Sequence, residues 1–187
     1  MMKRAVPAIA MILAGVARAA GPVPLYTADA GASRLEFTGN QAGAEFKGTF
    51  RKFTAAIGFA PDALAGSRFD VQIELNSADT LDQDRDTTLR GSDFFDVVHY
   101  PQAHYVARSF AKTATGYSAQ GALTLHGVTQ DVPVDFSFTS TAAGAKLEGT
   151  AHLKRLQFGV GRGDWRSTEW VKDEVKVSFS LVLKSGS

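Results

Sequence analysis

Along most of this chain, apolar and polar side chains alternate with a period of two. The alternation is strongest in Phe69–Leu75, Val134–Thr139 and Val175–Lys184, and it is typical of strands with one buried and one solvated face. Weaker alternation covers residues 34–38, 43–50, 53–60, 103–110, 117–125 and 146–153. The sequence therefore predicts nine strands, or eight if residues 43–60 form one long bent strand.

Turn residues separate these segments at intervals of about ten residues, which predicts antiparallel neighbours. Strands do not alternate with helical segments, so a parallel α/β sheet is not expected. The two remaining architectures are a sandwich and a closed barrel, and closure is favoured because it leaves no exposed edge strand. Two features of composition agree with a barrel around a lined cavity: thirteen Phe, and glycines inside strands at Gly48, Gly58, Gly121 and Gly149.

Two long stretches interrupt the alternation. Residues 77–99 are acidic, then basic, then aromatic, and residues 155–171 are rich in glycine and contain both tryptophans. Such stretches in a compact β domain usually form caps or binding loops. The first is predicted to contain a short helix near Thr80–Leu89, with Ser77 or Asp79 as its N-cap.

The N-terminal residues resemble a secretory signal. Lys3 and Arg4 precede an apolar run over residues 5–16, and residues 17–19 supply a small-x-small cleavage pattern. The alternative is a membrane anchor, but twelve apolar residues are too few to span about 30 Å of hydrocarbon. We therefore expect cleavage of residues 1–19 and a mature chain that begins at Ala20.

The mature region, residues 20–187, is expected to form a single domain in the periplasm. It retains 17 Lys and Arg against 19 Asp and Glu, a formal charge of −2, so it offers no basic surface for nucleic acid. The chain has no Cys, which excludes disulfides, thiolate metal sites and a cysteine nucleophile.

One acidic segment partly matches a calcium-binding loop. Asp82, Asp84 and Asp86 have the required spacing and Asp93 falls at the twelfth position, but Thr87 replaces the usual glycine. We expect a solvated, ion-paired face here, with calcium as the alternative.

Other signs of chemistry are weak. The four histidines, at positions 99, 104, 126 and 152, form no metal-binding pair, and residues 159–163 do not match a dinucleotide-binding loop. No nucleophile elbow or acid–base set is recognisable. The sequence thus predicts a binding protein, not an enzyme, without a metal or a cofactor.

Three blocks of sequence resemble a known family. They are LRGSDFFDVVHYPQA at residues 89–103, GALTLHGVTQDV at residues 121–132 and LQFGVG at residues 156–161, before a Val-rich last strand. Together they resemble the YceI family of exported lipid-binding proteins, over about residues 23–184. The third block, with Gly163–Trp165 and Thr168–Val171, is similar to the subgroup found beside membrane cytochrome b proteins.

The resemblance implies an all-β, lipocalin-like antiparallel barrel with an elongated apolar cavity and one or two short helices. It also implies an isoprenoid ligand, either a polyisoprenoid or a quinone-like lipid. Family members often carry His before the Leu-Arg of the first block. Thr88 stands there in this chain, so the resemblance does not carry a head-group contact to this position.

A cavity of this kind divides the candidate ligand-binding residues into two sets. For a polar mouth we choose Arg90, Asp93, His126 and Trp165. For the apolar lining we choose Phe37, Phe46, Phe69, Phe94, Phe95, Phe136 and Phe179, although buried aromatic residues are more usually plain core. We expect Phe94 and Phe95 to lie in a turn within residues 92–100 and to close one wall of the cavity.

The resulting hypothesis is a periplasmic carrier that holds an isoprenoid lipid in its barrel. The alternative is an accessory module that docks on a membrane redox protein of the cytochrome b type, with an incidental cavity. The sequence leaves both a monomer and a homodimer open.

Overall fold

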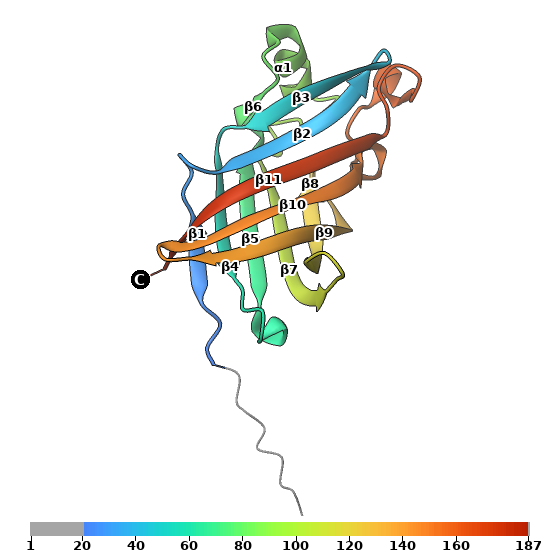
Figure 1. The fold of residues 1–187 in the computed structure, drawn as a ribbon. Helices are drawn as coiled ribbons and strands as arrows, with labels where there is room; N and C mark the ends of the chain where they lie inside the picture. The colour runs from blue at the N-terminus through green and yellow to red at the C-terminus, as the bar shows by residue number, and fades with distance from the viewer. Residues whose placement is uncertain (1–20, 187) are drawn as a thin grey trace, which may run out of the picture.

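The structure is a computed structural model that describes residues 21–186. The predicted signal segment lies outside these residues. Eleven strands form one antiparallel sheet, and eight of them close into a barrel in the order β1-β4-β5-β7-β8-β9-β10-β11 and back to β1 (Figure 1). The barrel strands are β1 (Leu25–Ala28), β4 (Phe53–Gly58), β5 (Arg68–Glu74), β7 (Gln102–Lys112), β8 (Tyr117–Leu125), β9 (Val128–Thr141), β10 (Gly144–Lys154) and β11 (Glu174–Ser185). The predicted barrel is confirmed, and the sandwich is excluded.

Strand β11 has two neighbours on one side. Its C-terminal part pairs with β1, whereas residues 176–180 pair with β2 (Arg34–Gln41). Strand β2 continues the sheet to β3 (Ala44–Phe50) and to the two-residue β6 (Ala78–Asp79). These strands extend the wall at one end of the barrel, above β1 and β4 in Figure 1.

Residues 43–60 form two strands and not one long strand. Strand β3 pairs with β2 and β6, but β4 pairs with β1 and β5. The backbone leaves the ladder at Arg51 and Lys52, where both amides bond to Ser77, one to its carbonyl and one to its hydroxyl. The alternation did not reveal the short strands β1 and β6, because two to four residues are too few to show a period.

Among the described residues there is a single α-helix, α1 (Gln83–Arg90), which covers the end of the barrel beside β6. It begins later than predicted, because neither predicted cap residue is used. The carboxylate of Asp82 accepts the Arg85 amide at 3.0 Å and is the N-cap. Asp79 instead accepts a hydrogen bond from the Leu81 amide, and the Ser77 hydroxyl donates to the carbonyl of Glu74.

Four short 3-10 helices lie at Leu64–Gly66, Leu75–Ser77, Arg155–Phe158 and Gly163–Arg166. No helix within residues 21–186 is long and apolar enough to cross a membrane.

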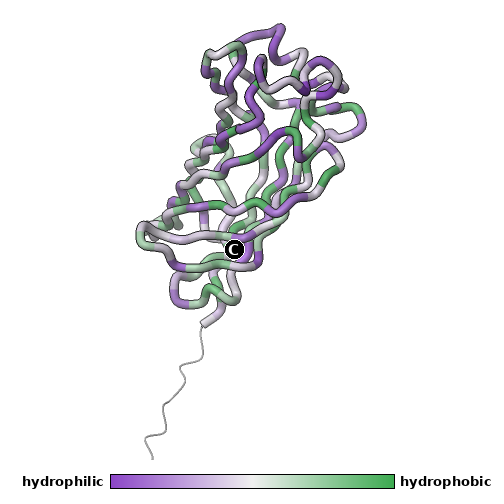
Figure 2. Tube along the Cα trace, turned by 90° about the vertical axis from the view of Figure 1, so that its right-hand side faces the viewer, coloured by the Kyte–Doolittle hydropathy of each residue, from purple (hydrophilic) through white to green (hydrophobic). Residues whose placement is uncertain are grey.

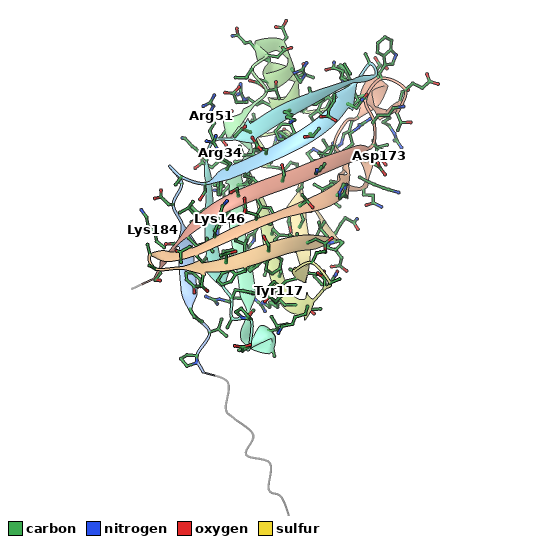
Figure 3. All side chains as sticks on the ribbon, viewed as in Figure 1. Arg34, Arg51, Tyr117, Lys146, Asp173 and Lys184 are labelled. Carbon is green, nitrogen blue, oxygen red and sulfur yellow. The ribbon has the colours of Figure 1, made fainter. Side chains whose placement is uncertain are left out.

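The buried apolar side chains form one core inside the barrel. One end is closed by an aromatic cluster, here called the floor, centred on the fully buried Phe59. Five other rings lie 4.9–6.3 Å from Phe59, namely those of Phe69, Phe110, Tyr117, Phe136 and Phe138. Figure 3 shows Tyr117 at this lower end and Asp173 at the opposite end. Figure 2 shows hydrophobic stretches along the wall strands and a more hydrophilic chain around the upper end.

Candidate functional site

An apolar cavity occupies the barrel between the floor and the loops of the opposite end. Its empty volume is about 1470 Å³, including the space at its opening, and its lining is almost wholly carbon. Every barrel strand except β1 contributes side chains, as do β2, β3 and α1. Among the lining residues are Leu35, Ile57, Ile73, Tyr105, Leu123, Val134, Leu147, Ala151, Val177 and Leu181. A site of this composition binds an apolar molecule through its surface and offers few directional contacts.

Several aromatic rings lie flat on the cavity wall because the strand beside them carries glycine. Three pairs share this arrangement: Phe37 lies over Gly48, Phe46 over Gly39 and Phe179 over Gly149. Each pair consists of direct cross-strand partners. A Cβ at Gly39 would lie 2.8 Å from the Phe46 ring, and one at Gly149 would lie 2.5 Å from Phe179. These glycines therefore leave room for the rings against the wall and preserve the open lumen.

Residues 92–100, here called the roof segment, place two predicted rings on the cavity. The chain turns tightly there: the Phe94 amide donates a hydrogen bond to the Gly91 carbonyl, and the Phe95 amide donates one to the Leu89 carbonyl. Both rings are buried and line the cavity. Phe95 packs against Phe50 on β3, with ring centroids 6.1 Å apart.

A second hollow adjoins the cavity, and we interpret it as the mouth of the cavity. The two share Phe46, Leu89, Phe94 and Val171. The polar and amphipathic residues of the mouth are Gln41, Asp82, Asp84, Arg85, Thr88 and Trp165. They come from the β2–β3 hairpin, from α1 with its N-cap, and from the loop before β11. This combination of an apolar interior and a polar opening suits a ligand with a long apolar tail and a polar end.

Arg85 organises the mouth. Its guanidinium carbon lies 4.5 Å from the centre of the Phe46 ring, a cation–π contact. Its Nε donates to Gln41 Oε1 at 3.2 Å, and it pairs with the Asp82 carboxylate at 3.3 Å. These contacts fix both Arg85 and Phe46 at the point where the polar mouth meets the apolar cavity.

The loop between β10 and β11 is held together by one buried arginine. The guanidinium of Arg155 donates to the carbonyls of Val160, Trp165, Val171 and Lys172 at 2.7–3.1 Å. Burial lowers the pKa of Arg155, and the nearby Asp173 opposes this shift, yet the group remains charged at neutral pH. Arg155 lines the cavity, but four of its five N–H donors are already used by the loop.

The predicted mouth residues are dispersed. Trp165 alone borders the mouth, where its ring lies 5.4 Å from that of Phe94. Arg90 instead donates to the carbonyls of Asn76 and Ala78 and ties α1 to the neighbouring strand. Asp93 is exposed, and its carbonyl accepts the amides of residues 161 and 162.

His126 lies away from the mouth, in the turn between β8 and β9. It is buried, its Nδ1 lies 3.2 Å from the Phe158 carbonyl, and its ring lies 4.9 Å from that of Tyr100. Its Nε2 has no hydrogen-bond partner among the described residues. Arg90, Asp93 and His126 therefore lie outside both hollows in this structure, because local hydrogen bonds hold each of them elsewhere.

The predicted lining residues fall mostly on the cavity. Six of them border it: Phe37, Phe46, Phe69, Phe94, Phe95 and Phe179. Phe136 belongs to the floor and does not border the cavity, whereas Phe69 belongs to both and forms the bottom of the lumen. Contact of these side chains with a ligand stays a prediction.

Tyr105 is a second buried polar side chain in the lining, besides Arg155. Its hydroxyl donates to the Val132 carbonyl at 3.1 Å, and burial strongly raises its pKa. The side chain is therefore neutral at physiological pH and adds no charge to the cavity.

The acidic segment of the partial calcium motif has other roles. Asp82 caps α1, and Asp86 accepts both the amide and the hydroxyl of Thr80 at 2.7–2.8 Å. Residues 83–90 are helical and do not wrap around a central point. Within residues 21–186 there is no group of three or more His, Cys, Asp or Glu that could hold a metal ion.

Several residues of the site were not predicted. Gln41, Arg85 and Leu89 meet at the mouth, and Arg155 and Phe59 fix the two ends of the cavity. Arg85 and Leu89 lay in the predicted helix, so their spacing of four residues was a usable signal for a shared face. Nothing in the sequence pattern marked Gln41 or Arg155.

Comparison with known proteins places the chain among proteins of the same architecture. The sequence model of a family described as "YceI-like domain" matches residues 26–183. A curated relative from Yersinia pestis, named UPF0312 protein, is 34% identical over 115 residues, which cover 57% of this chain and 60% of the relative. The match thus spans about three fifths of that relative's length.

Solved structures agree with the fold. BcnA of Burkholderia cenocepacia superposes with a TM-score of 0.78 and 31% identity, over 82% of this chain and 98% of BcnA. A domain from Saccharophagus degradans, described as polyisoprenoid binding, superposes with a TM-score of 0.61 over 88% of this chain and 99% of the domain. Its identity is 18%, so this second likeness concerns the fold alone.

Proposed function

The chain belongs to the YceI-like domain family, and from this we propose that it binds an isoprenoid lipid inside its barrel and carries it through the periplasm. The observation that carries the proposal is the apolar cavity inside the barrel, with a polar hollow adjoining it. An isoprenoid has the matching form, because its tail is an apolar chain and its head group, where present, is polar.

Such a complex needs few polar contacts to be stable. Transfer of apolar groups from water contributes about 0.8 kcal/mol for each buried CH₂. A few tens of carbons therefore outweigh the cost of immobilising the ligand, which is of the order of 4–15 kcal/mol. The Saccharophagus degradans domain, described as polyisoprenoid binding, supports this ligand class through its common fold. The proposed role is binding and transport, not chemical conversion.

The proposed location rests on the N-terminal sequence. Protein isolated from the periplasm is expected to begin at Ala20 or within two residues of it, because the small-x-small pattern ends at Ala19. N-terminal sequencing of the isolated protein tests this. Recovery of the chain from a membrane fraction with Met1 intact would support an anchor instead.

The ligand itself is tested by solvent extraction and mass spectrometry of protein purified from its native host. We expect an isoprenoid to be recovered at a substantial fraction of one molecule per chain. Two variants on the same strand provide the comparison. Val177 lines the cavity and Val182 faces solvent, so Val177→Trp fills the lumen whereas Val182→Trp does not.

Recovery of the lipid from wild type and Val182→Trp, with loss from a folded Val177→Trp, is the expected result. Circular dichroism establishes that both variants are folded. If folded wild-type protein carries no isoprenoid and binds none when it is supplied, the carrier function is wrong. If both variants retain the lipid equally, the lipid is bound outside the barrel.

A further inference from the structure

The most exposed large apolar side chains of residues 21–186 lie in loops at the open end of the barrel. Leu81 is 91% exposed, Val98 is 84% exposed and Trp170 is 65% exposed. Leu81 precedes Asp82 and Trp170 precedes Val171, two residues that border the mouth. Val98 belongs to the roof segment. The other two exposed large apolar residues, Leu25 and Val182, are less exposed and lie on the strands β1 and β11.

Leu81 departs from two ordinary preferences at once. It places a large apolar side chain in water, and its backbone is in the left-handed region with a φ of 59°, which non-glycine residues seldom adopt. The Asp79 carboxylate holds this conformation by accepting the Leu81 amide at 2.8 Å. A residue that breaks local rules on ordered backbone is a candidate for a function outside the fold itself.

The other two side chains are also held on ordered backbone. The Trp170 carbonyl accepts the Ala42 amide at 2.6 Å, which fastens the loop before β11 to the β2–β3 hairpin. Near Val98, the Asp96 carbonyl accepts the amides of His99 and Tyr100 at 2.8–3.0 Å. All three apolar side chains are therefore presented by fixed loops around the end where the cavity opens.

We propose that Leu81, Val98 and Trp170 dock the open end of the barrel on the surface of a lipid bilayer. The inference rests on the proposed function, since a lipid held in an apolar cavity must pass to and from a membrane. Docking at this end places the mouth against the bilayer and shortens the path of the tail through water. Tryptophan suits this role because its indole is both apolar and a hydrogen-bond donor, as at membrane interfaces.

The charges near Trp170 indicate how the surface binds. Apart from the buried Arg155, the same loop carries Arg162, Arg166 and Lys172 but also Asp164, Glu169 and Asp173, so neither sign predominates. Apolar insertion into the interface, and not attraction to anionic head groups, is therefore the main contribution to membrane binding. Binding to zwitterionic vesicles follows, and it persists at high salt because apolar burial is not screened.

Flotation with phosphatidylcholine vesicles tests the proposal on the mature chain. Wild type is expected to float with the vesicles at both 0.1 M and 1 M salt. A double variant, Leu81→Ser with Trp170→Ser, is expected to partition at least about tenfold more weakly, because it loses two large apolar groups. Val182→Ser, the matched control on the barrel wall, is expected to float like wild type.

Tryptophan fluorescence provides the second readout. In a Trp165→Phe background Trp170 is the remaining tryptophan, and vesicles should shift its emission to shorter wavelength. Lipids with brominated chains should quench it.

Three results would overturn membrane docking: failure of wild type to float, equal flotation of the double variant, or self-association through this face without vesicle binding. Isoprenoid content, measured separately by extraction, shows whether the carrier function has failed as well.

Discussion

The ring of Phe37 occupies the place where a side chain at Gly48 would stand. The two residues are cross-strand partners on β2 and β3, and a Cβ at position 48 would lie 2.2 Å from Phe37 Cζ. The ring therefore lies flat against the wall of the barrel only because position 48 has no side chain.

Gly48→Ala is expected to push the Phe37 ring into the lumen. Overpacking of this kind costs about 1–3 kcal/mol of stability, and we expect weaker binding of long isoprenoids in addition. Unfolding in denaturant and ligand titration measure the two effects. Gly58→Ala is the matched control, because its Cβ would meet the flexible Arg68 side chain at 3.3 Å. Adding Phe37→Leu to Gly48→Ala should restore binding, and failure to do so would contradict displacement of the ring as the cause.

Phe59→Ala and Phe94→Ala separate the floor of the cavity from its roof. Both side chains are buried, so each variant should lose about 3–5 kcal/mol of stability. Only Phe94 borders the cavity and its mouth. A long isoprenoid should therefore raise the melting temperature of Phe94→Ala more than that of wild type, because it fills the new space and stabilises the native state by mass action. Equal ligand-induced increases in Phe94→Ala, Phe59→Ala and wild type would mean that the roof segment has no part in binding.

Arg155→Lys tests the arginine that holds the loop before β11. Lysine keeps the charge but cannot reach four carbonyls in fixed directions. We expect a loss of about 3 kcal/mol or more, as for other buried charges that lose their partners. Faster amide hydrogen exchange should be confined mainly to residues 155–173. Unchanged exchange in this loop would show that the four contacts are dispensable.

Stability at alkaline pH should depend on Tyr105. Burial raises its pKa in the folded state well above the ordinary value, which is near 10. Below pH 10 the side chain is neutral in both states and its contribution is intact. As the pH rises above 10, the unfolded chain releases this proton first, so the free energy of unfolding falls. Tyr105→Phe should weaken that fall between pH 10 and 11.5, at a cost of about 1 kcal/mol at neutral pH from the lost hydrogen bond. Parallel pH profiles for the two proteins would contradict this assignment.

Chelation should leave the midpoint of thermal unfolding unchanged within about 1 °C. The described residues contain no group of three or more side chains that could hold a metal ion, so an ion should not stabilise the fold. The reason is local: Asp82 and Asp86 already accept hydrogen bonds from residues 80 and 85. Thermal unfolding with and without EDTA measures the effect. A drop of many degrees that calcium reverses would make the acidic segment a metal site.

The strands could be predicted because burial of one barrel face imposes a period of two on the sequence. Tyr117–Leu125 is a strand with the bounds that the alternation gave. The alternation left open whether residues 43–60 form two strands or one, because the break at Arg51 depends on the amides of residues 51 and 52 leaving the ladder for Ser77, far along the chain. The two-strand prediction is the one confirmed.

The cavity lining was easier to predict than the mouth for a similar reason. Residues such as Phe37 and Phe179 face inward by strand parity, which is a local property. Gln41, Arg85 and Trp165 meet only after three distant segments fold together, and no local pattern encodes that meeting. Phe136 shows the limit of parity, because it faces inward but at the level of the floor.

The aromatic cluster around Phe59 makes the barrel a blind tube. A chain-like guest can then move only lengthwise, so the end that enters first leaves last, and the polar end stays at the mouth. Each additional isoprene unit of the tail that lies in the tube must be withdrawn before the ligand is released. Residence time should therefore lengthen with the number of units until the tube is full and then level off, which would give the protein a built-in measure of tail length.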